Sequence, residues 1–255
     1  MGSNFKTYIF TSTITLVSAL LLSFSYSGLK DRVEKNIAFD IKRNIVKSSG
    51  YDISTMSKDQ ILDNYNANIT EIILNLDNTQ VNSVKWSDLI LVEDKMTGLS
   101  NYINKAYKAR FNKNPNDSTI DRYLPLFYHG EKKTYIIPIS GKGLWSTLFG
   151  FIAIAEDGNT LRGITFYKHK ETPGLGGEVD KEWFQENFIG KKIFKDNELV
   201  SVRVIKGSID LLPSSEKDYA VDGITGATIT SNGLSSFLER DLFRYEPFLR
   251  SLHVK

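Results

Sequence analysis

The chain has 255 residues, enough for one good-sized domain with an appendage, and its net charge is only +2 at neutral pH. This near balance of charge gives no reason to expect a nucleic-acid partner. The sequence contains no cysteine, which excludes disulfides, thiolate-held iron–sulfur clusters and cysteine nucleophiles. The histidines His129, His169 and His253 are scattered without metal-ligand spacing, so we expect no metal site.

The first predicted element is a transmembrane helix over residues 7–29, which carry no charge. A helix of this length spans about 35 Å, against about 30 Å of bilayer hydrocarbon. A cleaved signal peptide is the alternative, with Lys6 as its basic region and small residues near Ser23 to Ser27. We favour an anchor in contact with lipid, because the apolar run is long and a helical pattern continues beyond it. Counting lysine and arginine on both flanks weakly places the large domain in the cytoplasm.

Helical patterns continue after the anchor. Isoleucine or valine recurs every four residues from Val33 to Ile45, which predicts a helix that ends before Gly50. Ser57 and Gln60 form a plausible capping box for a second helix, whose apolar pattern extends to Leu76. Residues 77–121 are rich in Asn, Lys and Asp and are predicted to be a surface insert with short helices and no chemistry.

The character changes to short β-type runs from Tyr123 onward, and we expect strands over residues 134–139, 148–155, 161–167 and 199–204. Asp157 and Gly158 indicate a hairpin between two of them, and residues 182–188 a short helix. The predicted fold class is α+β, an antiparallel sheet with packed helices preceded by one transmembrane helix. We expect a tail at 1–6, the transmembrane helix at 7–29, a helical and polar insert region at 30–120, and one domain at 121–255.

The segment Asp222-Gly223-Ile224-Thr225-Gly226-Ala227-Thr228 is the most informative part of the chain. Its glycines and alanine clear bulk from around the Thr228 hydroxyl. The apolar residues that follow occupy one face of a helix, namely Leu234, Phe237, Leu238 and Leu242. A phosphate at Thr228 would therefore meet the N–H donors of a helix N-terminus. Taken alone, these residues favour the simpler interpretation of a capped helix after a turn, and they do not form a P-loop.

The segment resembles the flavinylation motif, in which an acidic residue is followed after two positions by Ser/Thr-Gly-Ala-Thr. Four further stretches resemble, in order and spacing, the C subunits of the sodium-translocating NADH:quinone reductases, a family with an FMN-binding domain. They are residues 143–146, 157–160, 171–179 and 190–192. The similarity is dense from about Lys132 to Leu249 and thin before it.

The resemblance implies FMN joined to Thr228 through a phosphoester, which a separate FMN transferase makes from FAD. Thr225, Gly226 and Ala227 would shape the loop beside the ester, and Asp222 would serve the transfer step. No catalytic residue is implied beyond the flavin itself.

The loop at residues 171–177 would bind the flavin ring, with Thr172 and Leu175 offering a hydrogen bond and an apolar contact. Gly174 and Gly176 would let the backbone approach the ring closely. Leu144 and Trp145 would pack near the ring, and Lys206 would place a positive charge near the flavin. From the residues alone, a tight structural loop, a core tryptophan and a solvated lysine remain the alternatives.

The chain has no dinucleotide fingerprint and a single anchor, which indicates an electron relay inside a larger complex. The resemblance implies that electrons arrive from an iron–sulfur centre and leave for a flavin on the B subunit of that complex. The partners would be the B, D, E and F subunits, with the A subunit as a further candidate. The family places the domain on the periplasmic face of the bacterial inner membrane, against the charge count. The alternatives are the G subunit of an Rnf ferredoxin:NAD oxidoreductase, or a membrane-tethered binding protein without a cofactor.

Overall fold

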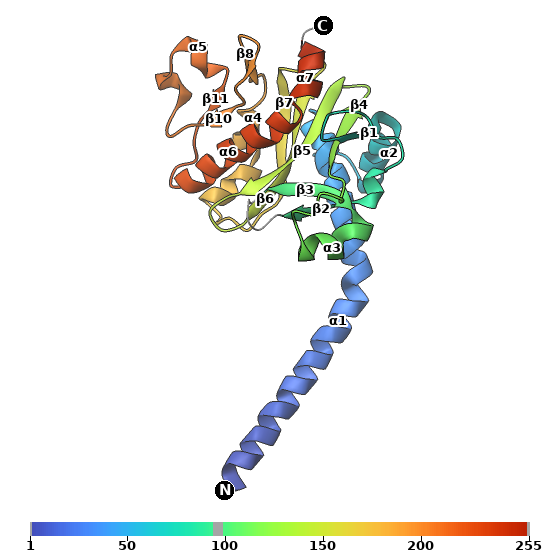
Figure 1. Ribbon diagram of the computed structural model, residues 1–255. Coiled ribbons are helices and arrows are strands. Elements are labelled where there is room, and N and C mark those ends of the chain that lie inside the picture. Colours follow the sequence, from blue (N-terminus) through green and yellow to red (C-terminus); the bar gives the residue numbers. More distant parts are fainter. Residues whose placement is uncertain (1, 94–98, 254–255) are drawn as a thin grey trace. The chain divides into compact units, whose positions relative to one another are not determined.

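The computed structural model describes residues 2–93 and 99–253 and divides into two units, residues 1–41 and 42–255 (Figure 1). The first unit is helical and forms most of α1 (Gly2–Ser48). By length and composition this helix can cross a membrane, with a mean hydropathy of 1.6 in its most apolar window. Thr11, Thr13 and Thr15 each donate a hydroxyl hydrogen bond to a carbonyl one turn earlier, so these polar groups are satisfied within the helix. As predicted, the helix ends just before Gly50.

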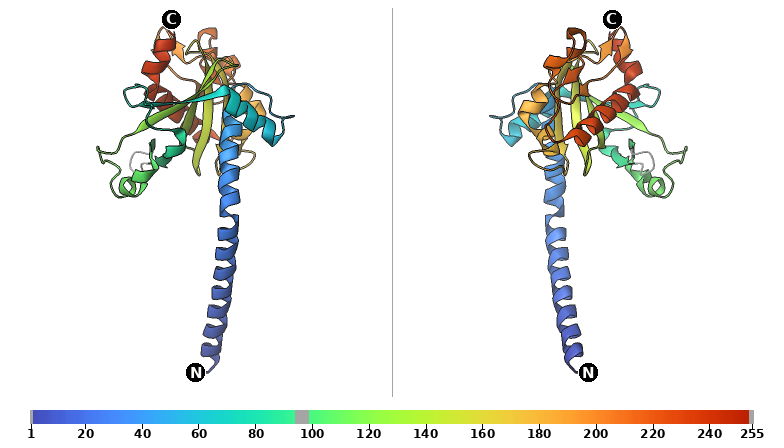
Figure 2. Two further views of the ribbon diagram at one scale, coloured as in Figure 1. Left: turned by 90° about the vertical axis from the view of Figure 1, so that its right-hand side faces the viewer. Right: turned by 90° about the vertical axis from the view of Figure 1, so that its left-hand side faces the viewer.

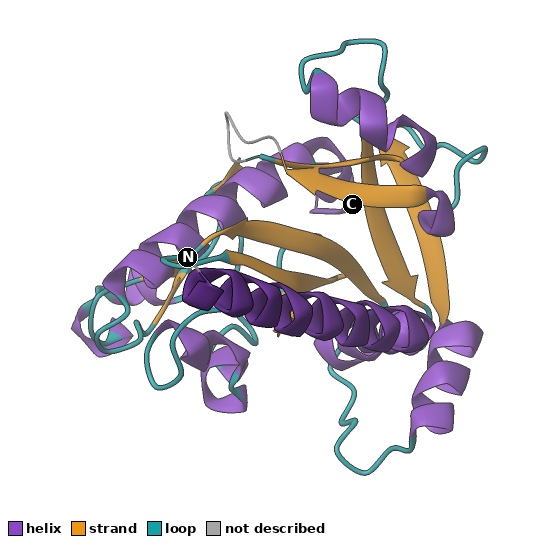
Figure 3. Cartoon of the chain, turned by 90° about the horizontal axis from the view of Figure 1, so that it is seen from below, coloured by secondary structure: helices purple, strands orange, loops and turns teal. Residues whose placement is uncertain are grey.

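The second unit is built on an antiparallel sheet with the strand order β2-β3-β4-β5-β6-β7, and β1 pairs with β4 (Figures 1 and 3). Helices lie around the sheet, which confirms the predicted α+β fold. The strands are β1 (Ile69–Asn75), β2 (Leu89–Glu93), β3 (Ser100–Asn104), β4 (Tyr123–His129), β5 (Thr134–Lys142), β6 (Thr147–Ala155) and β7 (Leu161–Lys168). Gly158, with φ +65°, makes the turn between β6 and β7, so the hairpin prediction is also confirmed.

The remaining elements are short, apart from the helix that carries the predicted site. The helices are α2 (Lys58–Asn68), α3 (Lys108–Lys113), α4 (Glu182–Glu186), α5 (Ser214–Lys217), α6 (Thr228–Arg244) and α7 (Glu246–His253). Two small pairs complete the unit: β8 (Phe194–Lys195) with β9 (Glu198–Leu199), and β10 (Arg203–Val204) with β11 (Ala220–Val221). The second pair is parallel and lies beside α6 (Figure 1).

Helix α6 packs against β5 (Figures 1 and 2). Its predicted apolar face is fully buried in the main core. Gly141 lies so close to the helix that an added Cβ would come within 2.2 Å of Phe237 Cβ. Asp241 is buried and accepts a hydrogen bond from Ser140 N at 2.8 Å, which fixes the helix to the strand. These contacts hold the second half of α6 against the end of β5.

Three local predictions were wrong. The helix expected as far as Leu76 ends at Asn68, and the strand β1 follows it. All seven residues of β1 pair with β4. Its isoleucines are β-branched and favour a strand, although their spacing in the sequence also fits a helix. The capping box of Ser57 and Gln60 is confirmed.

The two other errors concern strands. The segment 77–121 is not only a polar insert with short helices, because β2 and β3 extend the sheet at one end. Residues 199–204 do not form one strand. Ser201 has φ +59°, and the N–H groups of Val200 and Ser201 both donate hydrogen bonds to Ile193 O. The chain therefore turns between β9 and β10.

Candidate functional site

The N-terminus of α6 is the centre of the candidate site. The helix begins at Thr228 and has no side-chain cap and no acidic residue in its first turn. Thr228 and Thr225 are exposed, whereas Ala227 is buried immediately before the helix. The first N–H groups of a helix have no partner inside it, and together with the helix dipole they favour an anion.

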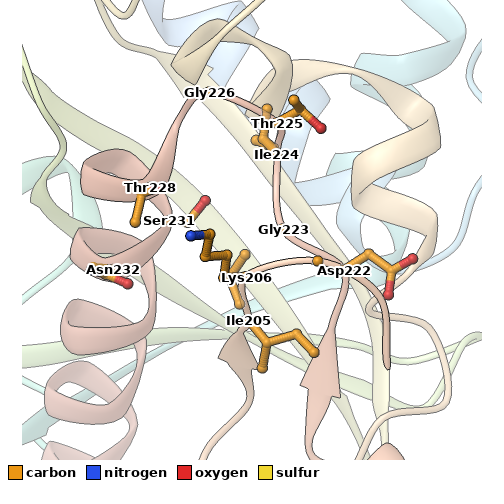
Figure 4. A pocket seen from close by; sticks show the side chains of 12 residues that line it. Ile205, Lys206, Asp222, Gly223, Ile224, Thr225, Gly226, Thr228, Ser231 and Asn232 are labelled. Carbon is orange, nitrogen blue, oxygen red and sulfur yellow. The ribbon is translucent and has the colours of Figure 1, made fainter. Parts of the chain in front are cut away.

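A pocket of about 420 Å³ opens at this helix end (Figure 4). One wall is the start of α6, and the others are the loop after β10 and the loop after β11. Five of the predicted site residues line it, namely Lys206, Asp222, Thr225, Gly226 and Thr228. The structure thus brings Lys206 to the threonine segment from a position 22 residues earlier in the chain.

The two loops that form the pocket are locked together. Asp222 Oδ1 accepts a hydrogen bond from Ile209 N at 2.7 Å, and Gly223 N donates to Gly207 O at 3.2 Å. A Cβ on Gly223 would lie 2.0 Å from Ile205 O, so only glycine allows this approach. The carboxylate of Asp222 therefore has a structural task in this chain, in addition to any part in a transfer step.

Two polar groups in the pocket are unpaired. The Lys206 ammonium has no hydrogen-bond or ion-pair partner among residues 2–93 and 99–253, and Figure 4 shows its side chain extending toward the first turn of α6. Ser231 Oγ is buried and also has no partner within these residues. Leaving a hydroxyl buried and unsatisfied costs about 1–3 kcal/mol. A cation, a helix N-terminus and an unused hydroxyl fit a phosphate group.

Sequence reasoning missed Ser231 as a site residue. The available signal was its spacing, because residues three apart on a helix share a face, and Ser231 follows Thr228 by three.

A second cluster adjoins the pocket and is held together by Glu171, which is 5% exposed. Its carboxylate accepts hydrogen bonds from the N–H groups of Leu144, Trp145 and Ser146 at 3.2, 2.9 and 3.0 Å. It also accepts one from Thr230 Oγ1 on α6 at 2.8 Å. Burial acts to raise the pKa of Glu171, but these hydrogen bonds outweigh it and hold the pKa below its ordinary value. One carboxylate therefore joins three separate segments.

The loop that begins at Glu171 is a tight, internally bonded turn. Thr172 O accepts hydrogen bonds from Leu175 N at 3.1 Å and Gly177 N at 2.9 Å. Gly174 has φ +77°, a conformation that favours glycine. A Cβ on Gly176 would lie 2.6 Å from Thr230 Oγ1, so this glycine lets the loop approach α6.

Three large apolar side chains of this cluster are exposed. Trp145 is 70% exposed, Leu144 43% and Leu175 42%. The alternative of a core tryptophan at Trp145 is therefore wrong. Leu175 lies over Gly226, since a Cβ there would come within 2.8 Å of Leu175 Cδ2. Exposed apolar groups beside an anion pocket suit a ligand with a phosphate and a flat apolar ring.

The predicted site residues thus fall into two adjoining groups. Lys206 and the residues of the threonine segment line the pocket, except for Ala227, which is buried next to Thr228. The others lie on the loops joined by Glu171, namely Leu144, Trp145, Thr172, Gly174, Leu175 and Gly176. These six do not line the pocket itself.

Comparison with known proteins gives consistent matches. The sequence model of the FMN-binding domain matches residues 143–242, which include both groups. The C subunit of the Na(+)-translocating NADH-quinone reductase of Vibrio anguillarum is 31% identical over 90% of this chain and 86% of its own length. The equivalent protein of Pseudomonas aeruginosa is 31% identical over 98% of this chain and 96% of its own length.

Solved structures agree with these matches. The crystal structure of the C subunit of the Na(+)-translocating NADH-quinone reductase from Parabacteroides distasonis is 29% identical, with a TM-score of 0.64. The alignment covers 87% of this chain and 96% of that one. NqrC of Shewanella oneidensis shares the fold at 20% identity, with a TM-score of 0.62 over 85% of this chain and 97% of that one.

Proposed function

The chain belongs to the family formed by the C subunits of the Na(+)-translocating NADH-quinone reductases, and we propose that it carries FMN on Thr228 as a covalent electron relay. It is an FMN-containing, membrane-anchored subunit of this oxidoreductase complex. The observation that carries the covalent assignment is the exposed Thr228 at the uncapped start of α6, beside a pocket that also holds the unpaired Lys206 ammonium.

The attachment is a transfer from FAD by a separate transferase. The Thr228 oxygen forms a bond to the phosphorus of the FMN half, and the bond from that phosphorus to AMP breaks. AMP leaves with the bridging oxygen, and the hydroxyl proton passes to the transferase. The exposure of Thr228 supports this step, because another enzyme must reach the hydroxyl.

Once attached, FMN supplies reversible one- and two-electron chemistry. The residues of this chain bind and orient it: the pocket holds the phosphate, and Leu144, Trp145 and Leu175 offer apolar contact to the ring. Because these side chains are exposed, a ring beside them stays open to neighbouring proteins of the complex. We propose that electrons reach this flavin from an iron–sulfur centre and leave for a flavin on the B subunit.

The assembly we propose includes the B, D, E and F subunits, with the A subunit as a further candidate, and α1 as a single-pass anchor in the bacterial inner membrane. We place the folded unit on the periplasmic side, following the family rather than the lysine and arginine count. Protease treatment of intact spheroplasts tests this placement, and full protection from outside would reverse it.

The central experiment is intact-mass measurement of the full-length chain after co-expression with the transferase. We expect the added mass of esterified FMN, retained after denaturation, and its complete loss in Thr228→Ala. Ser236→Ala is the matched control, because it removes an exposed hydroxyl of α6 that does not line the pocket. A Thr228→Ala chain that still carries covalent flavin would refute the assignment.

A further inference from the structure

We propose that Ser231 is a ligand of the phosphodiester, donating its hydroxyl hydrogen bond to an oxygen of the phosphate on Thr228. The inference rests on the proposed attachment to Thr228 and adds a second residue of α6 to the phosphate site. Lys206 and the first N–H groups of α6 complete the set of donors.

The position of Ser231 follows from the helix geometry. Ser231 lies three residues after Thr228, so the two side chains share one face of α6 and line the same pocket (Figure 4). Ser231 is only 5% exposed, and its Oγ is buried without a hydrogen-bond partner among the residues that the structure describes. Buried hydroxyls in folded proteins are ordinarily satisfied, so this one points to a group that occupies the pocket.

Neighbouring hydroxyls on α6 show the contrast. Thr230 Oγ1 donates to Glu171 Oε2 at 2.8 Å. Ser235 Oγ donates to Ser231 O at 3.0 Å and accepts from Val204 N at 2.8 Å. Both side chains fasten the helix to its surroundings. Ser231 has no such task and faces the pocket instead.

The charges of the pocket suit a phosphodiester, which carries one negative charge over two unesterified oxygens. Lys206 supplies a full positive charge and the helix N-terminus about half of one. Asp222 also lines the pocket and carries a negative charge, but its Oδ1 already accepts a hydrogen bond from Ile209 N. Ser231 adds a neutral donor, so the two free oxygens have several donors available from different directions.

The test uses the full-length chain in detergent, produced with and without the transferase, in wild-type form and as Ser231→Ala. Ser236→Ala is the control, because it removes an exposed hydroxyl of the same helix that does not line the pocket. Intact mass shows whether each chain is loaded. Tm is then measured for loaded and unloaded forms, and the ³¹P chemical shift for loaded chains, folded and in urea.

We expect Ser231→Ala to keep or raise the wild-type Tm without flavin, because it removes a buried hydroxyl that has no partner there and because alanine favours a helix. The rise in Tm from the unloaded to the loaded form is smaller in Ser231→Ala than in wild type and in Ser236→Ala. Its folded ³¹P resonance moves toward the position found in urea. A loaded Ser231→Ala chain with the wild-type gain in Tm and the wild-type ³¹P shift overturns the proposal. A wild-type chain that stays unloaded refutes the covalent attachment itself, so the two failures are distinguishable.

If Ser231→Ala folds but accepts no flavin, titration of the unloaded chains with free FMN and with riboflavin decides. Riboflavin lacks the phosphate, so its affinity should be the same in both chains. We expect FMN to bind about tenfold more weakly to Ser231→Ala, the size of a hydrogen bond to a charged group. Equal changes for both ligands, or no change for FMN, overturn the proposal.

Discussion

The Thr230 hydroxyl donates a hydrogen bond to Glu171 Oε2 at 2.8 Å and so ties the start of α6 to the loop at residues 171–177. The same carboxylate accepts from three successive N–H groups at residues 144–146. Segments that lie up to 86 residues apart in the chain are thus held by one side chain, from Leu144 to Thr230. The flavin contacts that we assign to them depend on this junction.

Replacing Glu171 by glutamine should loosen the junction. The amide keeps the shape but has one acceptor oxygen, and its NH₂ group would face N–H donors. We expect the free energy of unfolding to fall by about 1–3 kcal/mol, the cost of leaving a buried donor unpaired. Denaturant unfolding measures this loss, and flavin fluorescence anisotropy in the loaded chain should fall as the ring gains mobility. Glu182→Gln, at an exposed position of α4, should change neither value.

The same carboxylate predicts a dependence of stability on pH. Its pKa is lower in the folded chain than in the unfolded chain, where it is about 4.3. The stability that it contributes is therefore complete above the unfolded pKa and is lost as pH falls through the folded pKa. Unfolding measured from pH 7 down to pH 3 should show a loss below about pH 4 that is smaller in Glu171→Gln. Parallel curves for the two chains would contradict the assignment.

The parts of the fold that could be predicted from the sequence are those with local causes. The capping box of Ser57 and Gln60, the turn at Gly158 and the apolar face of α6 each lie within a few residues of chain. The strand β1 was mistaken for helix because its isoleucines also fit a helical period. The segment forms a strand because it pairs with β4, from Ile69↔His129 to Asn75↔Tyr123. The local sequence pattern gives no information about this partner strand, which lies more than 45 residues further along the chain.

In the candidate site, too, the part formed by contiguous residues could be predicted, and the part formed by distant segments could not. The threonine segment is contiguous, so its motif and the helix that follows could be recognised together. The role of Glu171 could not, because its donors come from segments that only the folded chain brings near. Ser231 was passed over because an N-terminal serine of a helix has an ordinary explanation as a capping residue, and only its missing partner sets it apart.

Replacing Gly223 by alanine tests whether the two pocket loops must touch. The added Cβ would meet Ile205 O at 2.0 Å, so backbone has to move. We expect a loss of about 1–3 kcal/mol in the free energy of unfolding and less flavin attached per chain. Gly130→Ala is the control, since its nearest atom would be Asn68 O at 3.8 Å, an ordinary contact. Wild-type loading in Gly223→Ala would show that the pocket tolerates separation of its walls.

Replacement of the exposed Trp145 by alanine should change flavin fluorescence but not stability, whereas replacement of the packed Trp86 should change stability but not flavin fluorescence. Trp145 is 70% exposed, so its loss should change the free energy of unfolding by less than about 0.5 kcal/mol. If it packs near the ring, its removal should raise the fluorescence of the attached flavin, because a nearby indole quenches excited flavin by electron transfer.

Trp86 packs edge-on against Phe127 and tilted against Tyr102, at 5.2 and 5.4 Å between ring centroids. Its replacement should lower the free energy of unfolding by about 2 kcal/mol or more and leave flavin fluorescence unchanged. Denaturant unfolding and steady-state fluorescence of the loaded chains measure both quantities. Unchanged fluorescence in Trp145→Ala would remove Trp145 from the ring site, while the stability comparison would still separate an exposed side chain from a packed one.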